Sequence, residues 1–360
     1  MQFTFGQVMA LLYSTLFGRP PASKETTRVY VDQSMYDFTA KFSRLCNVAY
    51  CVDAPITPLR TDFSCGESCR YFPNMTLDAV FGGDFYSTSI TGYTGTDHHL
   101  KEKYIVFRGT FSIPDIVTDI QFQRSPWLVQ LPPIVTTKYN DFKPAARANC
   151  TDCQIHDGFA KAFNETLQNA GPQINDFLSN NTDYKLYVAG HSLGAAQAQL
   201  FATSFKLQGY DPILVSYGQP RIGNKEFADF VSELFFDGDD GLSMNDTRRM
   251  YRFTHWNDIF VGLPDWGNYT HSVGEIYIDQ RDVYPPLNAV TACAGPENPD
   301  CHRGTFNLWE QINLFQNHLA YIYYIGYCAL NIGKRDVFNM PKYTGNYTYG
   351  HRSEYQTNLP

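Results

Sequence analysis

The apolar pattern around residue 190 predicts a strand that turns abruptly into a helix. Residues 184–189 form a short run with aromatic and β-branched positions, as buried strands do. Residues 195–207 are rich in Ala, Gln, Leu and Phe and contain neither Pro nor Gly, which favours a helix. Between the two runs lies Gly190-His191-Ser192-Leu193-Gly194, so glycines flank the turn on both sides.

Two further segments have a readable pattern. A strand is predicted from Tyr251, in a run that passes into a loop and ends at Asp258. A short helix is predicted after Ser112, a typical N-cap residue, with Asp115 at its third position. Its apolar stripe has positions i, i+3, i+4 and i+7, occupied by Ile113, Ile116, Val117 and Ile120. In most proteins such a stripe packs against the core.

The 360 residues are compatible with one large α/β domain. Residues 8–17 form an apolar run of signal-peptide length, although no Lys or Arg precedes it and no clean cleavage motif follows. No apolar run reaches transmembrane length. We therefore expect a signal peptide over residues 1–22, a single catalytic domain over 23–333, and a polar C-terminal tail over 334–360.

The Gly-x-Ser-x-Gly turn is the main candidate for chemistry. With a strand before it and a helix after it, the motif predicts a nucleophile elbow that presents Ser192 at the end of the strand. The backbone N–H of Leu193, the residue after the nucleophile, would then be one oxyanion donor. The alternative interpretation is an ordinary turn in which Ser192 only caps the helix.

A serine nucleophile needs an acid and a base, which follow it in the chain in this fold class. Asp258 is the best acid because it stands where a strand passes into a loop, whereas the acids between residues 237 and 246 lie in a polar Gly/Asp loop. The histidines C-terminal to Asp258 are His271, His302, His318 and His351. The sequence pattern alone does not choose between His271 and His318.

Charge and modification signals indicate the compartment. The net charge of −8 argues against nucleic-acid binding. Seven N-x-S/T sequons favour passage through the secretory pathway. Their acceptor residues are Asn74, Asn149, Asn164, Asn180, Asn245, Asn268 and Asn346. A secreted, extracellular protein is therefore expected.

Nine cysteines support the same compartment. Their spacing suggests three local pairs, Cys65 with Cys69, Cys150 with Cys153, and Cys293 with Cys301. A Cys-x2-Cys could be half of a zinc site, but no second pair stands at the usual zinc spacing. We therefore expect disulfides, and neither a metal nor a cofactor.

The chain resembles the fungal class 3 lipases, most closely the secreted yeast lipases of the Yarrowia type. The resemblance runs from about Val29 to Cys328. Its landmarks are the segments 105–110, 190–194, 218–224, 257–259, 271–275 and 317–321. The chain departs from the family in having Ala195 in place of a second Gly, and Phe260-Val261 in place of Val-Pro. The resemblance implies an α/β-hydrolase fold, with a central, mostly parallel sheet flanked by helices and a short helical lid.

The resemblance also assigns roles to individual residues. It implies that the base is His318 and that Thr110 is the second oxyanion donor. It implies that the apolar stripe after Thr110 belongs to a lid, which lies shut in water and opens at an oil surface. It suggests a fourth disulfide between Cys51 and Cys328, which leaves Cys46 as a buried free thiol.

These features together predict a secreted serine hydrolase that cleaves triacylglycerols or other long-chain esters at a lipid–water interface through an acyl-enzyme intermediate. A monomer without a nucleic-acid partner is expected. One alternative is an esterase of soluble or aryl esters, such as feruloyl esters. Another is a non-catalytic lipid-binding relative, against which the complete set of Ser192, Asp258 and His318 argues.

Overall fold

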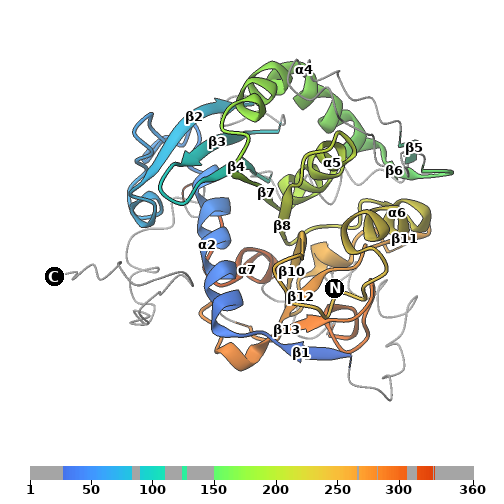
Figure 1. Cartoon of the computed structure of the whole chain (residues 1–360). Helices are drawn as coiled ribbons and strands as arrows, with labels where there is room; N and C mark the ends of the chain where they lie inside the picture. The colour runs from blue at the N-terminus through green and yellow to red at the C-terminus, as the bar shows by residue number, and fades with distance from the viewer. Residues whose placement is uncertain are drawn as a thin grey trace, which may run out of the picture.

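A nine-stranded, mostly parallel sheet forms the centre of the computed structural model (Figure 1). The structure describes residues 27–82, 90–109, 124–127, 150–265, 267–281, 283–305, 314–326 and 328. In spatial order the strands are β1 (Arg28–Tyr30), β13 (Val290–Cys293), β12 (Glu275–Ile278), β10 (Met250–His255), β8 (Ile213–Tyr217), β7 (Lys185–His191), β4 (Glu102–Phe107), β3 (Gly92–Asp97) and β2 (Met75–Phe81).

The central strands β4, β7, β8, β10 and β12 are parallel, and the outer strands pair antiparallel. Phe107 pairs with Gly190, and His191 pairs with Tyr217. The carboxyl ends of β4, β7 and β8 therefore meet at one edge of the sheet, which is where α/β proteins place their sites.

Helices cover both faces of this sheet. The helix α2 (Gln33–Ala49) lies on one face, and α7 (Leu314–Leu319) lies beside it in Figure 1. The other face carries α4 (Asp157–Ser179), α5 (Leu193–Leu207) and α6 (Lys225–Phe236). Strand periodicity explains the two cores, because Tyr104 and Val106 pack with α2 whereas Ile105 and Phe107 pack with α4 and α5.

Shorter elements complete the fold. A small antiparallel sheet contains β11 (Tyr269–Thr270), β9 (Gly223–Asn224), β6 (Gln154–His156) and β5 (Arg124–Pro126). The 3-10 turns are η1 (Cys69–Tyr71), η2 (Ile259–Gly262), η3 (Leu287–Ala289) and η4 (His302–Gly304). Within the described ranges, no helix is long and apolar enough to cross a membrane.

The predicted elements are confirmed where the structure describes them. The expected strand, turn and helix around residue 190 are β7, Ser192 and α5, and the strand before Asp258 is β10. The proposed signal peptide, the C-terminal tail, the helix after Ser112 and Thr110 lie outside the described residues.

The cysteine pairs are those expected from the sequence and the family resemblance. The disulfides join Cys51 to Cys328, Cys65 to Cys69, Cys150 to Cys153, and Cys293 to Cys301. Cys46 is free and buried in α2, where burial raises the pKa of its thiol. The bridge from Cys51 spans 277 positions and ties the end of α2 to the C-terminal end of the described chain.

Candidate active site

Ser192 stands on a strained turn between β7 and α5. Its φ of 59° and ψ of −127° are rare for a residue with a side chain and match the sharp turn of a nucleophile elbow. Both flanking glycines are required by space. A Cβ at Gly190 would lie 2.2 Å from the carbonyl oxygen of Gly194, and one at Gly194 would lie 2.4 Å from that of Phe107.

Asp258 is fully buried at the N-terminus of η2, where its carboxylate collects three hydrogen-bond donors. Its Oδ1 accepts from the backbone N–H of Phe260 at 3.0 Å, and its Oδ2 accepts from the hydroxyl of Tyr321 at 2.8 Å. The Nδ1 of His318 lies 3.0 Å from Oδ1 and 2.9 Å from Oδ2. Burial alone would raise the pKa of Asp258, but His318 and these hydrogen bonds lower it to about 2.

His318 lies near the end of α7, and only one of its two ring nitrogens, Nδ1, is hydrogen-bonded within the described part of the chain. Its Nε2 is buried without a hydrogen-bond partner among those residues. The ring packs against Phe260, with ring centroids 4.4 Å apart. Gly218 at the end of β8 leaves room for the ring, because a Cβ there would lie 2.9 Å from Cε1 of His318. Such an Nε2 can accept a proton from a group placed beside it.

His271 occupies a different environment. It is buried, and its Nε2 donates to the carbonyl oxygen of Val261 at 2.8 Å. Burial, together with the nearby guanidinium of Arg252, holds its pKa well below the ordinary value. The structure therefore pairs Asp258 with His318 and uses His271 to brace the turn that follows the acid.

Comparison with known proteins gives this arrangement its family. A sequence profile described as Lipase (class 3) matches residues 104–267. The crystal structure of the Lip2 lipase from Yarrowia lipolytica is similar over 84% of this chain and 98% of that chain, with 36% sequence identity and a TM-score of 0.75. The chain belongs to the class 3 lipase family.

Other relatives agree with this assignment. A protein of Gibberella zeae named secreted mono- and diacylglycerol lipase 2 is 29% identical, over 75% of this chain and 69% of that protein. Lipase II from Rhizopus niveus shares the fold, with a TM-score of 0.62, 23% identity, and coverage of 84% of this chain and 99% of that chain. The chain is therefore a secreted lipase, an enzyme that hydrolyses acylglycerol esters.

The end of the segment after β4, which leads to the expected oxyanion residue Thr110, approaches Ser192 closely. Leu193 is the first residue of α5, and first-turn N–H groups have no acceptor within their own helix. Thr110 itself lies outside the described residues, but the preceding Gly109 is in contact with the elbow. A Cβ at Gly109 would lie 2.8 Å from Cβ of Ser192 and 2.6 Å from the hydroxyl of Tyr50.

A hydrogen-bond chain from Tyr50, the C-cap of α2, to the backbone carbonyl of His318 was not predicted from the sequence. Burial and nearby His318 lower the pKa of His191 to about 3, so its ring is neutral. Its Nε2 is 2.8 Å from the carbonyl oxygen of His318 and must donate, which makes Nδ1 an acceptor for the hydroxyl of Tyr50 at 2.7 Å. His191 belongs to the Gly-x-Ser-x-Gly motif, but nothing in the sequence indicated a role for Tyr50, the residue before Cys51.

Tyr321 is another functional residue that the sequence analysis missed. It is fully buried, and burial raises its pKa well above the ordinary value, so its hydroxyl remains a donor to Asp258. The available signal was its position three residues after His318 in the segment 317–321, which we used only as a family landmark.

The two departures from the family pattern fit this geometry. Ala195 is fully buried inside α5, so a single methyl group is accommodated at the close helix–strand contact. Phe260 packs its ring on His318 and donates its backbone N–H to Asp258. The structure therefore places Phe260 against the Asp258–His318 pair.

Proposed function

We propose that this lipase cleaves triacylglycerols at a lipid–water interface through an acyl-enzyme intermediate on Ser192. The main support is the pair formed by Asp258 and His318, in which one imidazole nitrogen meets the carboxylate and the other is buried without a partner among the described residues. The same chain also contains the strained turn that carries Ser192, which would supply the nucleophile.

In the proposed mechanism, Oγ of Ser192 attacks the ester carbonyl while Nε2 of His318 takes the hydroxyl proton. The carboxylate of Asp258 stabilises the imidazolium that forms and fixes the tautomer. His318 then donates the proton to the leaving glycerol oxygen, and an acyl-serine ester remains. Water, deprotonated by the same nitrogen, then attacks the acyl carbonyl. As the bond to Oγ breaks, His318 returns the proton to Ser192 and the fatty acid leaves.

The negative oxygen of each tetrahedral intermediate needs donors. We assign this role to the backbone N–H of Leu193 and to Thr110, the latter from family resemblance and from the contact of Gly109 with the elbow. Loss of one such donor typically slows catalysis about 100- to 1000-fold.

Substrate class depends on the segment after Thr110. Each of the four apolar residues in the stripe from Ile113 to Ile120 is worth roughly 1.5–3 kcal/mol when buried, so exposing all four to water would cost up to about 6–12 kcal/mol. We propose that this stripe is a lid whose apolar face is accepted by an oil surface. The name of the Gibberella zeae relative makes mono- and diacylglycerols the second candidate substrates.

A comparison of substrates separates these possibilities. Initial rates are measured on emulsified trioleoylglycerol, dioleoylglycerol and monooleoylglycerol, and on a soluble short-chain ester. Hydrolysis of trioleoylglycerol at a rate comparable to that of the partial glycerides supports the proposal. Activity on the partial glycerides alone favours the second candidate, and activity on the soluble ester alone indicates an esterase.

The catalytic roles are tested by substitution. Ser192→Ala and His318→Ala should each reduce hydrolysis by up to about a million-fold, because the triad acts as a unit. His271→Ala is the matched control, since it also removes a buried imidazole and should leave most activity in folded enzyme. An inactive His271→Ala beside an active His318→Ala would show that the base is assigned to the wrong residue.

We also propose a signal peptide over residues 1–22, a monomer, and glycosylation at the sequons. Five sequon asparagines lie in described parts of the chain, and all five are exposed: Asn74, Asn164, Asn180, Asn245 and Asn268. N-terminal sequencing of the secreted enzyme, its mass before and after glycosidase treatment, and light scattering test these three points.

A further inference from the structure

The backbone carbonyl of Asp258 is held by a side chain 44 positions further along the chain. Nε2 of His302 lies 2.7 Å from this carbonyl oxygen. A carbonyl only accepts, so Nε2 must carry hydrogen. Burial lowers the pKa of His302 in spite of the nearby carboxylates of Glu275 and Asp258, which leaves the ring neutral with one donor.

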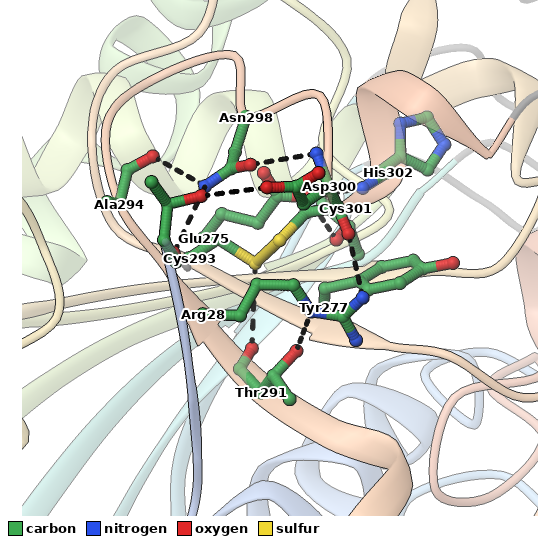
Figure 2. The surroundings of a disulfide bond; sticks show 12 residues. Arg28, Glu275, Tyr277, Thr291, Cys293, Ala294, Asn298, Asp300, Cys301 and His302 are labelled. Atoms are coloured by element: carbon green, nitrogen blue, oxygen red, sulfur yellow. Dashed lines mark hydrogen bonds between the residues drawn. A yellow bond between two sulfur atoms is a disulfide. The ribbon is translucent and has the colours of Figure 1, made fainter. Parts of the chain in front are cut away.

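The position of His302 is itself fixed by the Cys293–Cys301 disulfide (Figure 2). Cys301 directly precedes His302, and Cys293 is the last residue of β13 in the central sheet. The backbone N–H of His302 donates to Oε1 of Glu275 in β12 at 3.3 Å. The ring is therefore tied to two strands of the sheet through its own backbone.

The loop between the two cysteines is braced as well. The side-chain amide of Asn298 donates to the carbonyl oxygen of Ala294 at 3.0 Å and accepts from the backbone N–H of Asp300 at 2.9 Å (Figure 2). The guanidinium of Arg28 donates to the carbonyl oxygen of Asp300 at 2.8 Å. His302 thus extends from a rigid support and is not carried by a free loop.

His302 contacts the backbone of Asp258, where a small rotation would displace the carboxylate. The backbone N–H of Asp258 donates to the carbonyl oxygen of His255 at 3.1 Å, and the bond from His302 fixes the opposite end of the residue. Because Nδ1 of His318 lies within hydrogen-bond distance of both carboxylate oxygens, a rotation of the Asp258 backbone would move the carboxylate off the imidazole.

We infer that His302, held by the Cys293–Cys301 disulfide, is a positioning residue that orients Asp258 toward His318. The inference rests on the proposed function, in which Asp258 is the acid of the triad. A purely structural histidine would contribute stability alone. If His302 is a positioning residue, the loss of its N–H donor should also lower kcat.

The test compares two variants that differ mainly in that donor. His302→Gln retains a side-chain N–H, whereas His302→Met fills similar space without one. On a soluble short-chain ester we expect His302→Met to lower kcat about 10- to 100-fold with little change in KM, as displacements of about 1 Å do. His302→Gln should retain most of kcat. Circular dichroism and thermal melting establish the folded fraction, to which kcat is normalised.

His271 offers a matched control. It is also buried, and its Nε2 also donates to a backbone carbonyl, that of Val261, at 2.8 Å. His271→Met and His271→Gln therefore make the same chemical changes at a histidine that bonds to Val261 and does not contact Asp258. Both should keep kcat close to that of the native enzyme, even where the melting temperature falls.

A double-mutant cycle tests the disulfide. Cys293→Ser combined with Cys301→Ser should lower kcat, and adding His302→Met should then reduce kcat by less than it does in the native enzyme, because coupled changes are not additive. The control removes the other short bridge with Cys65→Ser and Cys69→Ser. In that background His302→Met should have its full effect.

Equal kcat values for His302→Met and His302→Gln would overturn the positioning role. Full additivity of His302→Met with loss of the Cys293–Cys301 bridge would overturn the role of the disulfide. Asp258→Asn identifies a failure of the proposed function instead, since it should lower kcat by about 10⁴-fold if Asp258 orients the base. An active Asp258→Asn variant would remove the premise, whereas an inactive one beside a fully active His302→Met would refute only the inference.

Discussion

The hydrogen bond from Tyr321 to Asp258 provides a quantitative test of the site's electrostatics. Tyr321→Phe removes one hydroxyl donor from a fully buried carboxylate, and the contacts from His318 and Phe260 remain. A hydrogen bond to a charged group is worth about 1.5–3 kcal/mol. We expect the free energy of unfolding at pH 7 to fall by about this amount.

The pH dependence has a definite sign. The folded-state pKa of Asp258 is about 2, below its ordinary value of 3.8. The ionised carboxylate therefore stabilises the fold above pH 3.8, and this contribution, about 2–3 kcal/mol, is lost as the pH falls through 2. Without Tyr321 the pKa of Asp258 rises by roughly one to two units, at about 1.4 kcal/mol per unit. The stability difference between the native enzyme and Tyr321→Phe should therefore shrink as the pH falls below about 4.

The assay is urea unfolding at a series of pH values from 7 down to about 2.5. The control is a variant that loses a hydrogen bond to an uncharged acceptor. Tyr93→Phe suits this purpose because Tyr93 is also fully buried and donates to the carbonyl oxygen of Leu45 at 3.1 Å. That change should cost about 0.5–1.5 kcal/mol at every pH. If the two variants had the same cost and neither cost depended on pH, our account of the Asp258 environment would be wrong.

Two further predictions concern stability and the interface. Replacing Cys51 and Cys328 together by Ser should lower the free energy of unfolding by more than about 4 kcal/mol, because the bridge closes a very long loop. Chemical denaturation should show a much smaller loss for Cys46→Ala, and a similar loss would contradict the entropic argument. Replacing Ile116 and Ile120 by Ser should lower the ratio of triglyceride to soluble-ester hydrolysis, measured above and below the concentration at which lipid separates. An unchanged ratio would indicate a core helix in place of a lid.

The sequence by itself determined the local parts of this protein. The strand and helix around Ser192 follow from short-range periodicity, and the two glycines that flank the turn are part of a recognisable motif. The structure adds the reason for them, because neither Gly190 nor Gly194 has room for a side chain. The pairs Cys65–Cys69 and Cys293–Cys301 are close along the chain, so spacing was sufficient to suggest them. Asp258 could be selected because it stands in the loop just after a predicted strand.

Contacts between distant segments could be decided only by the tertiary structure. Both His271 and His318 follow the acid in the chain, and the residues alone did not separate them. In the structure His318 meets the carboxylate from 60 positions away, whereas His271 bonds to Val261. Tyr50 and His302 gave no local signal for the same reason, and the position of Tyr321 in the segment 317–321 did not reveal its hydrogen bond to Asp258. A hydrogen bond to a buried group depends on which segments pack together and exclude water, and neither periodicity nor spacing along the chain records that.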